Sequence, residues 1–296
     1  MAINIFAGLE NLEIKNLDGE HLFDKQSGTD AATLSRNAAK VVKKTELSQE
    51  EREVAMLFDK TYTCPVCDSI NKSRTVRTGK ARMIGMDTDL KPNFEYIEPL
   101  KYDVVACPNC GYTSVSRYFV PMIPSQKKSI MEKISPNYVH TPEPQGVFSY
   151  EFALERHKMA LACAVVRNAK PSERAFTCLK AGWLCRSWRN SLKDAEKPDM
   201  EAIKNTTELE NEFIKLAFEG FVMALQNERF PICGMDEYTI DYLIAALGYE
   251  LGNYDVSAKM ISTILNSLTA PARMKDKARN LKEELIVKIK EKNNKA

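Results

Sequence analysis

Two cysteine pairs are the residues of this chain whose type and spacing best suit chemistry. The first pair is Cys64-Pro65-Val66-Cys67, and the second is Cys107-Pro108-Asn109-Cys110, followed by Gly111. Each Cys-Pro-x-Cys segment can form a tight turn that directs two sulfur atoms to one point, and two such turns form a tetrahedral site suited to Zn²⁺. The predicted ligands are Cys64, Cys67, Cys107 and Cys110. Four sulfur ligands occupy every coordination position, so the predicted ion, one Zn²⁺ per chain, is structural.

Two other chemistries fit the same cysteines. A Cys-x-x-Cys spacing also lowers thiol pKa values, so a pair of redox dithiols is one alternative. An iron centre with the same four sulfur ligands is compatible with the spacing as well. Two proline-containing pairs on either side of a β-rich segment favour the metal site over the dithiols. The separation between the pairs, residues 68–106, exceeds the roughly 15–20 residues of ordinary ribbons, which predicts a protruding insertion over residues 77–101.

The composition is typical of a soluble globular protein, with 44% hydrophobic and 28% charged residues among 296. A formal net charge of +2 gives no strong attraction to nucleic acid or to an anionic membrane. No segment approaches the roughly 20 apolar residues of a membrane helix, and residues 1–20 carry Glu10 and Glu13 where a secretory signal is basic. The weak net charge and the lack of a membrane helix predict no membrane partner. The remaining cysteines lack paired spacing, which predicts reduced core residues in the cytoplasm.

The N-terminal half divides into three predicted parts. Residues 1–47 are polar and weakly periodic, so we expect them to be poorly ordered. Residues 48–124 form a zinc-ribbon-like module that begins with a helix, in which Ser48 and Glu51 make a capping box and Leu57 and Phe58 continue the apolar stripe. Short β-rich runs interrupted by glycine and proline follow the helix. Residues 125–147 contain several prolines and predict a linker with one short helix.

The C-terminal half, residues 148–296, has helical periodicity throughout. Two of its helices, over 236–251 and 254–268, match a tetratricopeptide unit. Ala245 and Ser257 are small, and Gly252 and Tyr254 mark the turn. The other predicted helices cover 150–168, 172–188, 208–227 and 275–292. We therefore predict an α+β fold, in which a small β-rich Cys₄ zinc-ribbon-like module precedes an all-α tetratricopeptide-like domain able to fold without metal.

Several short motifs occur in the order found in one bacterial family. They are Phe58-Asp59-Lys60, Arg77-Thr78-Gly79-Lys80-Ala81-Arg82, Asp87-Thr88-Asp89-Leu90-Lys91-Pro92, Cys107-Pro108-Asn109-Cys110-Gly111-Tyr112 and Leu251-Gly252-Asn253-Tyr254. Through them the chain resembles, over nearly its whole length, the family called domain of unknown function 2225. The resemblance implies a soluble bacterial protein with a cysteine-pair N-terminal half and a helical, tetratricopeptide-like C-terminal half. It implies no activity, because the family is uncharacterised.

No catalytic constellation accompanies the cysteines, so we expect a protein that is not an enzyme. Helical repeats present a concave face to partners, which predicts a cytoplasmic adaptor for protein–protein interaction, with Trp188 and the basic helix over 275–292 as contact surfaces. A nucleic-acid-binding protein is the alternative, because residues 72–82 hold five basic residues and no acidic one. Asp87 and Asp89 are acidic residues beside a predicted turn, and we expect them to serve that turn rather than a cation.

Overall fold

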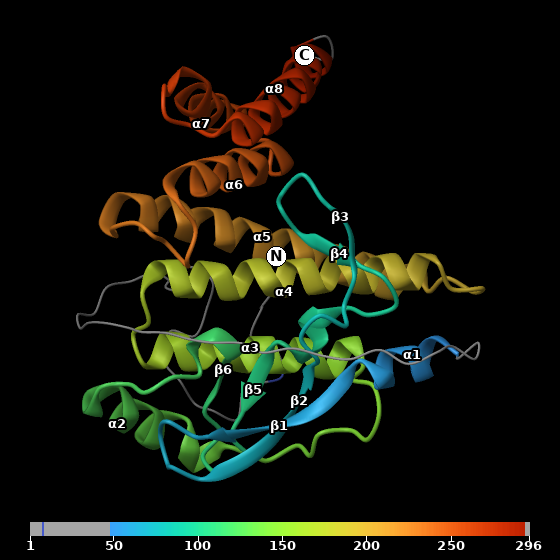
Figure 1. Ribbon diagram of the computed structural model, residues 1–296, viewed down its shortest axis with the longest axis vertical. Coiled ribbons are helices and arrows are strands. Elements are labelled where there is room, and N and C mark those ends of the chain that lie inside the picture. The colour runs from blue at the N-terminus through green and yellow to red at the C-terminus, as the bar shows by residue number, and fades with distance from the viewer. Residues whose placement is uncertain (1–7, 9–47, 294–296) are drawn as a thin grey trace.

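The β-strands lie in the first half of the chain and pair in three separate antiparallel hairpins (Figure 1). The computed structural model describes Gly8 and residues 48–293, and the segment predicted over 1–47 otherwise lies outside the described residues. The hairpins pair β1 (Leu57–Thr63) with β2 (Ile70–Val76), β3 (Met83–Met86) with β4 (Pro92–Phe94), and β5 (Val104–Ala106) with β6 (Thr113–Val115).

Helices make up most of the rest of the described chain. They are α1 (Gln49–Ala55), α2 (Pro124–Lys133), α3 (Tyr150–Val166), α4 (Pro171–Lys193), α5 (Met200–Asn227), α6 (Glu237–Glu250), α7 (Tyr254–Asn266) and α8 (Ala272–Asn293). Strand hairpins followed by helices confirm the predicted α+β class. No helix within the described ranges has both the length and the apolar character needed to cross a bilayer.

Helix α1 begins as predicted but ends earlier. Ser48 accepts a hydrogen bond from the backbone of Glu51, and the Glu51 side chain accepts one from the backbone of Ser48, so the capping box is present. The prediction that Leu57 and Phe58 continue this helix is wrong, because both belong to β1. Leu57 pairs with Val76 at one end of a ladder that spans the whole strand. A full set of ladder hydrogen bonds outweighs weak local helix propensity here.

The insertion over residues 77–101 packs against the helical half. It contains the β3–β4 hairpin, and all four residues of β3 are exposed. Between the two strands, Asp89 and Lys91 are buried. Asp89 accepts a hydrogen bond of 2.7 Å from Trp183 Nε1 on α4. The hairpin therefore leaves the cysteine ribbon, as expected of an insertion, but its turn is attached to α4.

One hydrophobic core joins the two halves of the chain. Helix α3 packs on β5 and β6 and also on α4, so it lies between these strands and α4 (Figure 1). Ile130 and Ile134, from the predicted linker over 125–147, are fully buried in this core together with Tyr112. The linker segment thus contributes to folding. The predicted boundary between residues 48–124 and 148–296 stays a prediction, and the core extends across it.

The last three helices form a second core. Helices α6 and α7 make the helical hairpin predicted over 236–268, with Gly252 at φ +76° in the turn. Ala245 and Ser257 are fully buried where a larger side chain would separate the helices. Helix α8 packs on both. A helical C-terminal half is therefore present, and its likeness to tetratricopeptide repeats stays a prediction.

Candidate metal centre

The first cysteine pair forms the tip of the β1–β2 hairpin. The backbone N–H of Cys64 donates to the Ser69 carbonyl at 2.9 Å, and the N–H of Asp68 donates to the Cys64 carbonyl at 3.0 Å. The N–H of Val66 points to Cys64 Sγ at 3.4 Å. Asp68 completes the turn with φ +57°, a left-handed conformation that Asp tolerates better than most residues. This turn places both sulfur atoms on one side.

The second pair forms the same turn at the tip of the β5–β6 hairpin. The Cys107 N–H donates to the Tyr112 carbonyl at 2.8 Å, and the Gly111 N–H donates to the Cys107 carbonyl at 3.0 Å. Gly111 takes the position of Asp68 in the first turn, with φ +75°. A Cβ atom on Gly111 would lie 2.5 Å from Cγ of Tyr138, so only glycine fits without a shift of that ring. Two features therefore require glycine at position 111, namely the positive φ of its backbone and the close approach of the Tyr138 ring.

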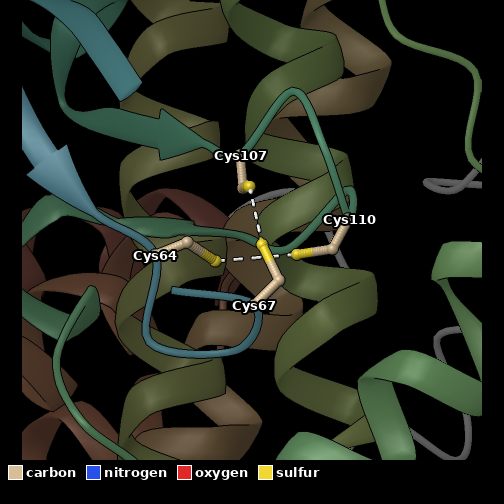
Figure 2. Close-up of side chains that lie close together, drawn as sticks. All are labelled: Cys64, Cys67, Cys107 and Cys110. Atoms are coloured by element: carbon tan, nitrogen blue, oxygen red, sulfur yellow. Dashed lines mark hydrogen bonds between the residues drawn. The ribbon is translucent and has the colours of Figure 1, made fainter. Parts of the chain in front are cut away.

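Figure 2 shows the two turns facing each other, with the sulfur atoms of all four cysteines converging. The sulfur atoms of Cys64 and Cys110 are 3.6 Å apart, as are those of Cys67 and Cys107, and all four lie within 4.8 Å of one another. Sulfur ligands about 2.3 Å from Zn²⁺ in a regular tetrahedron are about 3.8 Å apart. A disulfide would need about 2.05 Å. The four sulfur atoms therefore lie together, at separations that are compatible with one tetrahedral metal ion and too long for a disulfide.

Polar groups around the sulfur atoms complete the centre. The Ser69 hydroxyl lies 3.1 Å from Cys67 Sγ and 3.2 Å from Cys107 Sγ. Asn71 Nδ2 donates to Cys107 Sγ at 3.5 Å, and Asn109 Nδ2 donates to Cys67 Sγ at 3.4 Å. Such donors stabilise thiolate charge and orient the ligands. The sequence analysis did not identify Ser69 and Asn71 as part of this centre. A hydroxyl and an amide side chain within four residues of Cys67 could have indicated them.

When no metal is bound, hydrogen bonds among the thiols raise the pKa values of two cysteines and lower that of a third. Hydrogen bonding with Cys107, followed by burial, raises the pKa of Cys64 to about 12. Hydrogen bonds with Cys107 and Cys64 likewise raise the pKa of Cys110. Hydrogen bonds from Cys110 and Cys64 lower the pKa of Cys107. A metal ion must therefore displace protons from Cys64 and Cys110. Its affinity should decrease as the pH falls, because protons compete for these sulfur atoms.

The centre is attached to the protein core through α3. Cys64, Cys107 and Cys110 are buried, and only Cys67 is partly exposed. The backbone N–H of Thr113, just after the second turn, points to Cys163 Sγ of α3 at 3.4 Å. Burial raises the pKa of this Cys163 thiol to about 12, so it stays protonated. Three of the four candidate ligands are thus enclosed by the protein, and the second turn is joined to α3.

The acidic pair of the insertion binds an arginine. Asp87 and Asp89 each form an ion pair with Arg186, at 3.3 Å and 2.9 Å. Glu210 and Glu250 contact the same guanidinium at 2.7 Å and 2.8 Å. The prediction that these two aspartates serve a turn is only partly right. Asp89 accepts a hydrogen bond from the Lys91 N–H within the turn, but it also accepts one from Trp183 on α4.

The basic stretch over residues 72–82 is largely engaged within the chain. Arg74 pairs with Asp59 at 3.2 Å, Arg77 Nε donates to the Leu57 carbonyl at 2.9 Å, and Arg82 lies 3.5 Å from Glu95. The three arginines of the stretch therefore have protein partners.

Trp188, the predicted contact residue, is half-buried. Its ring is stacked on Tyr150 with ring centroids 6.3 Å apart, and it packs against the main core. Trp188 thus packs on the core while part of its side chain stays accessible, and its role as a partner contact stays a prediction.

Comparison with known proteins gives one match. A family model described as an uncharacterised protein conserved in bacteria (DUF2225) matches residues 57–285, which include both cysteine turns and the helices from α2 to α7. No curated protein and no solved structure matches the chain. The motifs quoted from the sequence lie within the matched residues.

Proposed function

The chain belongs to the uncharacterised bacterial family DUF2225, and from this premise we propose that it is a non-enzymatic cytoplasmic adaptor built around a structural Zn²⁺. One observation carries the metal part of the proposal. The four cysteine sulfur atoms lie within 4.8 Å of one another at the surface of a shared core. Four sulfur ligands leave no position for a substrate or an activated water, which supports a structural role.

The outer face of α8 supports the adaptor part. Helix α8 packs on α6 and α7 through Ala278, Leu281 and Leu285, which are buried. Ile286 and Val287 lie on the other side and are 42% and 54% exposed. A helix that packs on the core through one face usually has polar residues on the opposite face. Two exposed branched apolar side chains at this place favour a partner surface.

The charge around these two residues indicates the chemistry of the partner. Lys282 and Lys290 are each four residues from Ile286, so they flank it on the same helix face. The whole of α8 holds eight Lys or Arg against four Asp or Glu. A protein segment that combines apolar side chains with carboxylates is complementary to this face. We propose such a segment as the partner.

Recovery of partners from the native bacterium, with the chain at its endogenous level, tests the adaptor. Ile286→Asp should abolish recovery of the partner, because it places a carboxylate in the apolar contact. Leu268→Asp is the matched control, since Leu268 is 97% exposed in the loop before α8 and touches none of this face. Loss of the partner in both variants, or in neither, would contradict the α8 site.

Nucleic-acid binding is the second candidate, and the net positive charge of α8 favours it. Arg74 and Arg77 have partners within the chain, which argues against these two as phosphate contacts, whereas Arg82 is largely exposed. Phosphate binding releases counterions, so raising the salt from about 50 to 200 mM should weaken it steeply. A partner held by apolar contacts at Ile286 should remain bound under the same change. The salt dependence of whatever is recovered therefore separates the two functions.

A further inference from the structure

A groove beside the candidate metal centre is lined by both apolar and charged side chains. It has a volume of about 500 Å³ and lies between the second cysteine turn, the segment after α2 and the start of α3. Its apolar wall is formed by Pro108, Tyr138, Val139, Pro142, Phe152 and Met159. Small-molecule sites have this order of volume, and they are mostly apolar with a few polar groups that orient the ligand.

The ion pairs around the groove leave one positive charge without a counterpart. Two acidic residues line the groove, and each has a basic partner. Glu143 pairs with Arg156 at 2.5 Å, and Glu155 pairs with Lys158 at 2.8 Å. Lys72 of β2 also lines the groove, and its exposed ammonium group has no such partner among the described residues. The groove is therefore suited to a ligand with a single negative charge.

Arg156 adds a hydrogen-bond donor that lacks an acceptor. One terminal nitrogen of its guanidinium binds Glu143, and the other donates to the Ser73 hydroxyl and to the Val104 carbonyl, at 3.2 Å and 2.7 Å. Its Nε is buried and has no hydrogen-bond partner within the described part of the chain. Buried polar groups nearly always have a partner, and a charged donor bonds most strongly to an anionic oxygen. The wall of the groove thus favours a carboxylate over an uncharged group.

We propose that the groove binds a small organic carboxylate whose body is apolar, either an acyl chain or an aromatic ring. The apolar wall receives the body, because its burial removes apolar surface from water. Lys72 and Arg156 attract the carboxylate. The Tyr138 hydroxyl and His140 Nδ1, which lie 3.4 Å apart, supply further polar contacts in the same groove. The inference is independent of the partner surface proposed on α8.

Displacement of a fluorescent probe from the full-length chain tests the proposal. The probe is anilinonaphthalene sulfonate, which combines aromatic rings with one negative charge. Decanoate and naphthoate should displace it at concentrations several-fold lower than decanol and naphthylmethanol, their uncharged counterparts. The more effective carboxylate identifies the acyl chain or the aromatic ring as the preferred body. Equal displacement by the carboxylates and the alcohols, or displacement by none of them, would overturn the proposal.

Substitution of Lys72 locates the charge that the ligand meets. Lys72→Met should weaken binding of both carboxylates about fivefold, as expected for the loss of one exposed ion pair, and should leave the alcohols unchanged. Lys80→Met is the matched control, because Lys80 is also exposed but lies outside the groove, in the turn between β2 and β3. The same loss in both variants would show an effect of overall charge and would contradict the site.

A second variant tests the groove itself. Val139→Asp places a like charge in the lining and should weaken binding of both carboxylates about tenfold. Leu268→Asp should leave their binding unchanged. Val139 and Leu268 are 74% and 97% exposed, so both variants should fold. Wild-type affinity for the carboxylates in Val139→Asp would mean that they bind elsewhere, and the proposal would fail.

Discussion

Trp183 and Asp89 are the residues that join the insertion to the helical half. Trp183 Nε1 of α4 donates to Asp89 Oδ2 at 2.7 Å, and the same oxygen lies 2.9 Å from Arg186 of α4. Only 2% of the Asp89 surface is exposed. The β3–β4 hairpin is attached through its turn, because β3 itself is exposed, and Asp89 is the buried carboxylate of that turn.

Asp89→Ala should lower the free energy of unfolding by about 3 kcal/mol. The change leaves the Trp183 N–H without its acceptor and removes one of the carboxylates that neutralise Arg186. Urea denaturation followed by Trp fluorescence measures the effect. Arg82→Ala is the control, since its ion pair with Glu95 is exposed and should contribute less than about 1 kcal/mol. Equal stability of the two variants would show that the contact to Trp183 is not important.

Gly111→Ala should be destabilising by about 2–4 kcal/mol and should weaken metal binding. The alanine adds a left-handed backbone penalty and a clash with the Tyr138 ring. Gly79→Ala has nearly the same φ with open space around it, so it should cost only about 1–2 kcal/mol. Adding Tyr138→Ala to Gly111→Ala should restore metal affinity in part, measured by competition with a chromogenic chelator. An unchanged affinity in Gly111→Ala would argue against the tight turn.

Removal of the metal should destabilise the whole chain. We expected the helical half to fold without metal, but Tyr112, Ile130 and Ile134 are buried with α3 in one core. Loss of the cysteine turns should therefore loosen the packing of α3. A chelator should lower the thermal midpoint of a single transition, seen equally in far-UV circular dichroism and Trp fluorescence. A helical signal that melts at the same temperature with and without chelator would restore the two-domain view.

The thiols should react in a fixed order after chelation. Cys67 is the partly exposed ligand, whereas Cys163 and Cys185 are buried with pKa values raised by burial to about 12. A maleimide should therefore modify Cys67 first, and Cys163 and Cys185 only when the chain unfolds. Peptide mass spectrometry at several reaction times gives the order. Early modification of Cys185 in the metal-bound protein would show that the α4 core opens more readily than its packing suggests.

His157 should make the protein sensitive to mild acid. Burial lowers the pKa of this α3 histidine to about 4, with Nδ1 bonded to the Ala153 carbonyl at 2.8 Å. Between its ordinary pKa of about 6.5 and about 4, the unfolded chain binds a proton that the folded chain does not. Stability should thus fall over that range as the pH decreases, by about 3 kcal/mol at most.

His157→Gln isolates this contribution from that of the metal ligands, which also take up protons in acid. Urea midpoints of the variant should fall less than those of the wild-type chain from pH 6.5 to 4. Parallel pH curves for the two proteins would mean that the histidine is not the group responsible.

Local patterns in the sequence predicted the elements with strong short-range signals. The capping box at Ser48 and Glu51 begins α1, and Gly252 ends α6 where the hairpin turns. These features act through neighbouring residues, so they can be recognised without the fold. The end of α1 was missed because the pairing of Leu57 with Val76 depends on a strand many residues away.

The sequence by itself determined the two cysteine turns, because the geometry of a Cys-Pro-x-Cys turn is contained in four residues, and it predicted that Cys64, Cys67, Cys107 and Cys110 could hold one metal ion. Only the tertiary structure decided what surrounds them. It placed Ser69 against two sulfur atoms, Tyr138 over Gly111, and Asp89 beside Trp183. These contacts join residues whose spacing follows no local period. The contact of Asp89 with Trp183 forms because buried polar groups must find partners wherever the packed core brings them together.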